Sequence, residues 1–435
     1  MWSCLGEVYL VIIVSLMLVL GRLGEELSHK FLGFLFFIIG LLVLAGEGSF
    51  LSSFIGWSSL LTLGKLLICF LGGFCMIEEL KKVGVEYGLV LLLSLLGLFF
   101  LMTSRSLITF YVGLEIQSLS YYVLVSYRRD SSYSTESGLK YFIVGSMFSG
   151  LILMGCHLVY YSIGSIYFEN LERILVYGMP DWTFYVGSLL LFVGVIFKLS
   201  GAPFHQWYID VLDGSDIRTS RLLSILPKIG MLVFLLRLLG VWGDIGFVLD
   251  VLWYCSLLSM LVSVVGCYYQ RKVKRFLAYS SIGHIGYLLM CLSSGKVEGF
   301  EVMNYLLIYG VMTLGLWIVI EKSKLVYIEE LRDVVKGNRL IGVMILIICL
   351  SMIGIPPLYG FNIKVDLLIN VFKEGNILIG CLSIFCMILA GFNYLRWLKV
   401  VYYEGSISSK VLNISLDTSL ILSLFVGMLI LMGFC

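Results

Sequence analysis

The chain has 435 residues, of which 60% are hydrophobic and 13% are charged; its formal net charge is +2 and its mean hydropathy is +1.01. Roughly a quarter of the residues in a soluble protein are charged, so this composition excludes a soluble globular protein and indicates a polytopic membrane protein. We therefore expect the lipid bilayer as its surroundings and no nucleic acid as a partner.

Apolar runs long enough to cross about 30 Å of hydrocarbon recur along the whole chain. They cover residues 5–21, 31–48, 58–77, 87–104, 106–126, 138–163, 183–208, 219–241, 245–268, 275–293, 302–321, 339–371, 376–402 and 412–434. The first run has no basic residues before it and no small-residue cleavage site after it, so we expect it to be retained in the protein. The sequence predicts an all-α fold of about 14 transmembrane helices.

Two of these runs, 183–208 and 339–371, are too long for one straight helix across the bilayer. At ~1.5 Å per residue they would measure about 39 Å and about 50 Å. Each contains a break of Gly and Pro, GAP at 201–203 and GIPP at 354–357. A proline removes a backbone donor, which lipid cannot replace. In transporters, such interrupted helices in matching halves mark the ion path.

Ionisable residues inside the runs point to protons as the ion. Lys198 and Lys364 lie beside the two breaks, and Glu115 and Lys228 each lie about 13–14 Å from the start of their runs. Lys140 opens the sixth run, where we expect it to approach the Glu115 carboxylate. An ammonium at this depth costs at least ~2.5–3.5 kcal/mol. Burial lowers the pKa of a lysine and a nearby carboxylate raises it, so moving Glu115 would switch a lysine between holding and releasing a proton.

His284 is a candidate relay because imidazole titrates near neutral pH; the alternative is a hydrogen-bonded contact between helices. Asp366 is a candidate counter-ion of Lys364. Polar side chains that could hold connecting waters are Ser200, Ser224, Tyr279, Ser280, Ser281 and Tyr359. The alternative for the whole charged set is inert salt bridges, which would leave positive charge uncompensated because one buried acid faces four lysines.

Basic residues in the loops predict the orientation of the chain. Eighteen, Arg221 among them, follow odd-numbered runs and four follow even-numbered runs, so both termini are predicted on the outer side. Alanine and glutamine, whose codons need cytosine, occur only four and three times. This scarcity indicates an organellar gene and favours the mitochondrial inner membrane over a bacterial plasma membrane.

Several stretches resemble the antiporter-like subunit 2 (chain N) family of respiratory complex I, NADH:ubiquinone oxidoreductase. The stretches are FYVGLEIQSL at 110–119, LKYFIVGS at 139–146, KLSGAPFHQW at 198–207, DVLDGS at 210–215, SILPKI at 224–229, LAYSSIGHIGY at 277–287 and GIPPLYGF at 354–361. The resemblance implies that Glu115 and Lys140 form a modulating pair, that Lys198 and Lys228 are central lysines, and that Lys364 is the exit-side lysine.

The same resemblance implies how the chain is organised. It predicts an N-terminal three-helix segment at 1–86, two inverted five-helix repeats at 87–243 and 244–403 with broken helices seven and twelve, and a C-terminal helix at 404–435. It also implies a proton-translocating subunit that lies among other membrane-arm subunits and carries no redox centre. FMN, iron–sulfur clusters and ubiquinone are then expected in other subunits of the complex.

Two other functions are weighed against this one. Subunits of cation/proton antiporters and of membrane-bound hydrogenases share the lysines beside broken helices, and they form the main alternative. A purely structural membrane scaffold would need no lysines at mid-membrane.

Overall fold

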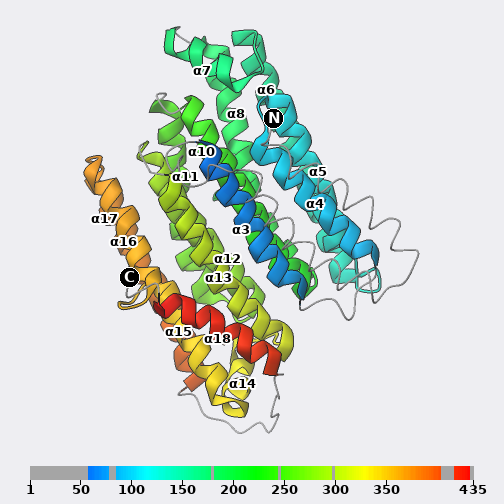
Figure 1. The fold of residues 1–435 in the computed structure, drawn as a ribbon, viewed down its shortest axis with the longest axis vertical. Coiled ribbons are helices and arrows are strands. Elements are labelled where there is room, and N and C mark those ends of the chain that lie inside the picture. Colours follow the sequence, from blue (N-terminus) through cyan, green and yellow to red (C-terminus); the bar gives the residue numbers. More distant parts are fainter. Residues whose placement is uncertain are drawn as a thin grey trace. The chain divides into compact units, whose positions relative to one another are not determined.

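The computed structural model describes residues 57–77, 85–177, 181–242, 246–295, 299–402 and 416–431, and in these ranges every regular element is a helix (Figure 1). Eight of the described helices are long and apolar enough to cross a membrane. The predicted all-α membrane fold is confirmed. The number of helices stays a prediction, because the runs at 5–21 and 31–48 lie outside the described residues.

A first compact unit contains the described residues up to Ser200 together with Gln206–Val251. Its helices are α3 (Trp57–Ile77), α4 (Val85–Thr103), α5 (Leu107–Val125), α6 (Ser132–Ile163), α7 (Phe168–Tyr177), α8 (Trp182–Lys198), α9 (Gln206–Gly214) and α10 (Ile217–Trp242). Helix α10 packs against α3, α4, α5, α7, α8 and α9. It is therefore the central helix of this unit, and most of its side chains are buried.

The second compact unit contains Gly201–His205 and the described residues from Leu252 onward. Its elements are α11 (Gly246–Tyr269, whose first residues belong to the first unit), α12 (Val273–Ser293), α13 (Gly299–Ser323), the 3-10 helix η2 (Ile328–Glu330), α14 (Leu331–Gly337), α15 (Arg339–Ile353), α16 (Tyr359–Lys373), α17 (Ile377–Tyr402) and α18 (Leu416–Leu431). Helix α15 packs against α13, α14, α16, α17 and α18, so the broken pair α15/α16 lies within this unit's helix packing.

The two units contain the same small antiparallel β-bridge at the same place in the order of elements. In the first unit it joins Ser106, just before α5, to Tyr167, just before α7. In the second it joins Lys272, just before α12, to Tyr327, just before η2. The repeat boundaries at 87–243 and 244–403 stay a prediction.

Both predicted helix breaks are confirmed. Helix α8 ends at Lys198 and α9 begins at Gln206, while α15 ends at Ile353 and α16 begins at Tyr359. One residue in each break has left-handed backbone geometry: Ser200 has φ 63° and Gly354 has φ 87°. A left-handed residue ends a helix by turning the chain away from the helix axis, so the breaks come from local geometry as well as from the prolines that follow.

Helix α6 begins six residues before the predicted start at 138. Ser131 caps it, since its Oγ accepts a hydrogen bond from the Ser134 backbone N–H at 3.3 Å, and such a cap satisfies one of the free donors at a helix start. The prediction that Lys140 opens this helix is wrong: Lys140 lies about two turns inside it. The helix start was predicted too late because the mostly polar residues 132–137 do not belong to the apolar run.

Candidate functional site

Two lysines of the first unit border the same small cavity. Lys198, the last residue of α8, and Lys228, on α10, both line it, together with Ser118 and Ser200. Its volume is about 10 Å³, which is close to the minimum that one water molecule needs. The break after α8 and the centre of α10 therefore bring two predicted site residues to one small cavity.

Lys228 is held by an aromatic face. Its side chain is 2% exposed and its Nζ lies 4.5 Å from the centre of the Tyr208 ring, on α9. The ring face attracts a cation. Pro227, directly before it, lacks a backbone N–H, so the carbonyl of Leu223 loses its usual helical donor, and both Leu223 and Pro227 line the cavity.

Glu115 and Lys198 are linked through other side chains. Lys198 Nζ donates to the Tyr122 hydroxyl at 3.4 Å, and Glu115 Oε2 accepts from Ser118 Oγ at 3.4 Å. In the part of the chain that the structure describes, Glu115 and Lys198 form no ion pair with each other, although they lie within range of electrostatic attraction. Their coupling is therefore indirect in this conformation.

Lys140 lies in a different setting from the one expected. Its side chain is 49% exposed, and its Nζ lies 2.7 Å from Oε1 of Glu136, one turn earlier on α6. Side chains four residues apart on a helix are neighbours, so this pairing follows directly from the earlier start of α6. Glu136 was missed in the sequence because it lies before the apolar run.

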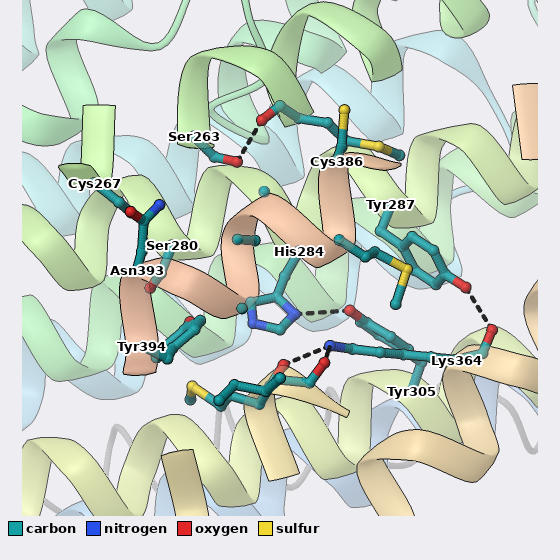
Figure 2. Close-up of a pocket in the computed structure, with 17 residues that line it drawn as sticks. Ser263, Cys267, Ser280, His284, Tyr287, Tyr305, Lys364, Cys386, Asn393 and Tyr394 are labelled. Carbon is teal, nitrogen blue, oxygen red and sulfur yellow. Dashed lines mark hydrogen bonds between the residues drawn. The ribbon is translucent and has the colours of Figure 1, made fainter. Parts of the chain in front are cut away.

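Lys364 bridges the break of the second unit. Its side chain is 8% exposed, and its Nζ donates to the backbone carbonyls of Met352 at 2.5 Å and Ile353 at 3.2 Å (Figure 2). Carbonyls in the last turn of a helix lack intrahelical donors and carry the negative end of the helix dipole. The expected counter-ion Asp366 is exposed, and the end of α15 takes the role that a carboxylate was expected to fill.

His284 and Lys364 line the same cavity of the second unit. His284 Nδ1 lies 2.7 Å from the Tyr305 hydroxyl, and Tyr287, one turn further along α12, donates to the Lys364 backbone carbonyl at 2.5 Å (Figure 2). All four residues line a cavity of about 60 Å³. This volume is well above the ~10–15 Å³ that one water needs. Ser280, one of the predicted water-holding residues, also lines it.

The remaining buried cations have structural contacts. Lys65 Nζ lies 5.7 Å from the centre of the Phe99 ring. Arg221, counted above with the loop residues, is instead fully buried in α10, where it donates to the Cys75 carbonyl near the end of α3 at 2.9 Å. A cation is favoured at that end of a helix, so Arg221 joins α10 to α3 and contributes no charge to a loop.

Sequence reasoning missed the tyrosines that surround the charged residues. Tyr122 follows Glu115 by seven residues and Tyr287 follows His284 by three, so helical spacing alone could have placed each on the same face as its neighbour. Tyr208 and Tyr305 come from other helices. No sequence pattern near Lys228 or His284 indicates these two tyrosines, because their contact with the charged residues depends on how the helices pack.

A family model described as "NADH:quinone oxidoreductase/Mrp antiporter, TM" matches residues 104–390. NADH-ubiquinone oxidoreductase chain 2 of Marchantia polymorpha is 35% identical over 335 residues, which are 73% of this chain and 67% of the relative. NADH-quinone oxidoreductase subunit N of Pelagibacter ubique is 35% identical over 334 residues, which are 74% of this chain and 69% of the relative.

Solved structures share the fold over the whole chain. A chain of respiratory complex I from Thermus thermophilus matches with a TM-score of 0.83 and 24% identity, over 99% of this chain and 97% of that one. A chain of an archaeal membrane-bound sulfane sulfur reductase matches with a TM-score of 0.89 and 20% identity, over 99% and 94%. At these identities the likeness extends to the fold alone.

Proposed function

This chain belongs to the NADH:quinone oxidoreductase/Mrp antiporter family, and we propose that it is a proton-translocating membrane-arm subunit of NADH:ubiquinone oxidoreductase. The observation that carries the proposal is the placement of buried lysines on cavities at both helix breaks: Lys198 and Lys228 in one unit, Lys364 in the other. Buried ammonium groups are costly in a membrane and are usually kept for function.

We propose that protons move along six residues in total. In the first unit these are Glu115, Lys140, Lys198 and Lys228, and in the second they are His284 and Lys364. The contacts of the three buried lysines include a ring for Lys228, a hydroxyl for Lys198 and backbone carbonyls for Lys364. A change in neighbouring charge can therefore tip such a lysine between its protonated and neutral forms.

The energy for this movement would come from quinone chemistry elsewhere in the complex. It would arrive as electrostatic and conformational coupling through neighbouring membrane-arm subunits. We propose that this chain itself binds no redox cofactor, and that FMN, the iron–sulfur clusters and ubiquinone belong to other subunits. The scattered cysteines, without a Cys-x-x-Cys motif, support that division.

The finer points of organisation and location are also proposals. We place the chain in the mitochondrial inner membrane with both termini on the outer side, supported by the loop charges and the cytosine-poor composition. The repeated β-bridge and the repeated order of elements support two structural repeats.

Replacing Lys228 with Met tests the function. The variant should assemble and should reduce an artificial acceptor at the parental rate, while proton pumping in reconstituted vesicles falls on the order of a hundredfold or more, the range expected for loss of a proton-transfer group. Lys399→Met is the matched control, because Lys399 is exposed near the end of α17. Unchanged pumping by Lys228→Met would refute the proposal.

The alternative, a cation/proton antiporter or membrane-bound hydrogenase subunit, is separated by association. Purification of the tagged chain with NADH-oxidising subunits supports our proposal. Sodium-dependent antiport by a purified complex without those subunits would support the alternative.

A further inference from the structure

A row of polar side chains runs along one face of α5 from Glu115 to Tyr122. Glu115, Ser118 and Tyr122 are spaced three and four residues apart, which places them on the same side of the helix. From the first to the last, the row covers about 10 Å along the helix axis. Lys198 contacts the row at its Tyr122 end.

The contacts along this row are continuous. Ser118 Oγ donates to Glu115 Oε2 at 3.4 Å, and Ser118 also lies close enough to Tyr122 to interact with its hydroxyl. The Tyr122 hydroxyl in turn accepts from Lys198 Nζ at 3.4 Å. Ser118 and Tyr122 are buried. Two hydroxyls therefore connect the only predicted buried carboxylate with the lysine at the first break.

The Tyr122 ring is held in place by α6. The ring lies edge-on to Tyr141 at 4.6 Å and to Phe142 at 5.7 Å between centres. Its hydroxyl lies against Gly145, where an added Cβ would come within 2.1 Å of the oxygen. Because the space exists only while residue 145 has no side chain, α6 fixes the position from which Tyr122 reaches Lys198.

We propose that Tyr122 is a proton relay between Lys198 and Glu115, an inference that rests on the proposed function. A tyrosine hydroxyl can accept one hydrogen bond while donating another. When an N–H bond of Lys198 breaks, the Tyr122 oxygen takes that proton and releases its own toward Ser118, which passes its proton to the Glu115 carboxylate. Lysine and glutamate end neutral, the two hydroxyls are restored, and the reverse sequence returns the charge.

Tyr122→Phe tests the relay, with Tyr121→Phe as the matched control. Tyr121 is the adjacent buried tyrosine, and its hydroxyl lies toward Ser94 on α4, not toward Ser118 or Lys198. The Tyr122 variant should assemble normally, while pumping falls on the order of tenfold or more. The solvent deuterium isotope effect on coupled turnover should rise, because proton transfer becomes limiting, which a packing defect alone would not cause. Equal pumping and equal isotope effects in the two variants would overturn the relay.

A second pair of variants keeps Tyr122 itself and changes only the space beside its hydroxyl. Gly145→Ala displaces the Tyr122 hydroxyl, whereas Gly150→Ala, on the same helix, has no atom within 4 Å of the added Cβ. Loss of pumping in the first and not in the second supports the relay, and loss in neither contradicts it. If Lys228→Met abolishes pumping while Tyr122→Phe does not reduce it, the relay is refuted and the proposed function stands. Unchanged pumping by Lys228→Met would refute the proposed function itself.

Discussion

The buried lysines of the site contact three different kinds of neutral group. Lys228 faces the Tyr208 ring, Lys198 binds the Tyr122 hydroxyl, and Lys364 binds two carbonyls at the end of α15. A full ion pair with a buried carboxylate would hold the charge firmly, since breaking such a pair costs ~3–5 kcal/mol. Contacts with neutral groups restrain a charge less than such an ion pair would.

The hydrogen bond between His284 and Tyr305 yields a prediction at this scale. Tyr305→Phe removes the hydroxyl 2.7 Å from Nδ1 of the half-buried His284, and a hydrogen bond of this kind contributes about 0.5–1.5 kcal/mol. The imidazole should then adopt several orientations, and proton pumping in reconstituted vesicles should fall severalfold. Tyr254→Phe, at an exposed position on α11, is the control; parental pumping by Tyr305→Phe would show that this bond does not position His284.

The site lies at two helix breaks, one between α8 and α9 and one between α15 and α16. At the break between α15 and α16, Gly354 takes a left-handed conformation, and the Lys364 side chain crosses back to the carbonyls that the break exposes. The lysine thus stabilises the end of α15 while remaining in a cavity that waters can enter. The break therefore both ends α15 and exposes the carbonyls that bind the charged Lys364 side chain.

Gly354→Ala tests this coupling of break and site. A left-handed conformation costs an L-residue about 1–2 kcal/mol, and the added Cβ would lie 3.2 Å from Lys364 Cδ. We expect the purified complex to lose activity faster at elevated temperature and to pump less well. Gly246→Ala, where the Cβ meets nothing within 4 Å, should match the parent. Equal half-lives for the two variants would contradict the prediction.

Among the described residues, each compact unit has a cavity lined by buried lysine: Lys198 and Lys228 in the first, Lys364 in the second. If protons pass both sites in one route, removal of either lysine stops the same process, and residues that act together give non-additive effects. If each unit conducts protons by itself, a variant that lacks one of the two lysines retains part of the proton flow.

The double variant Lys228→Met with Lys364→Met distinguishes the two cases. We expect it to pump no worse than the slower single variant, because both lysines serve one route. The measurement is the initial rate of proton uptake per NADH oxidised in vesicles. Partial pumping in each single variant and none in the double variant would show two independent routes.

The spanning helices, the helix breaks and the family of this protein could be predicted from the order of residues along the chain. Apolar runs located the described spanning helices, because a segment in lipid must be apolar and about 20 residues long. Gly354 and Pro356 predicted a break, because their backbone chemistry ends helices wherever they occur. Motifs around Glu115, Lys228 and His284 were sufficient to indicate the family.

Contacts between helices could be decided only by the tertiary structure. Lys140 was expected beside Glu115, but the earlier start of α6 brings it to Glu136. Lys364 was expected beside Asp366, but the end of α15 holds it. Composition and local chemistry therefore determined that this protein crosses a membrane with lysines at two broken helices. The partners of those lysines depend on the direction from which each helix approaches, which the order of residues does not contain.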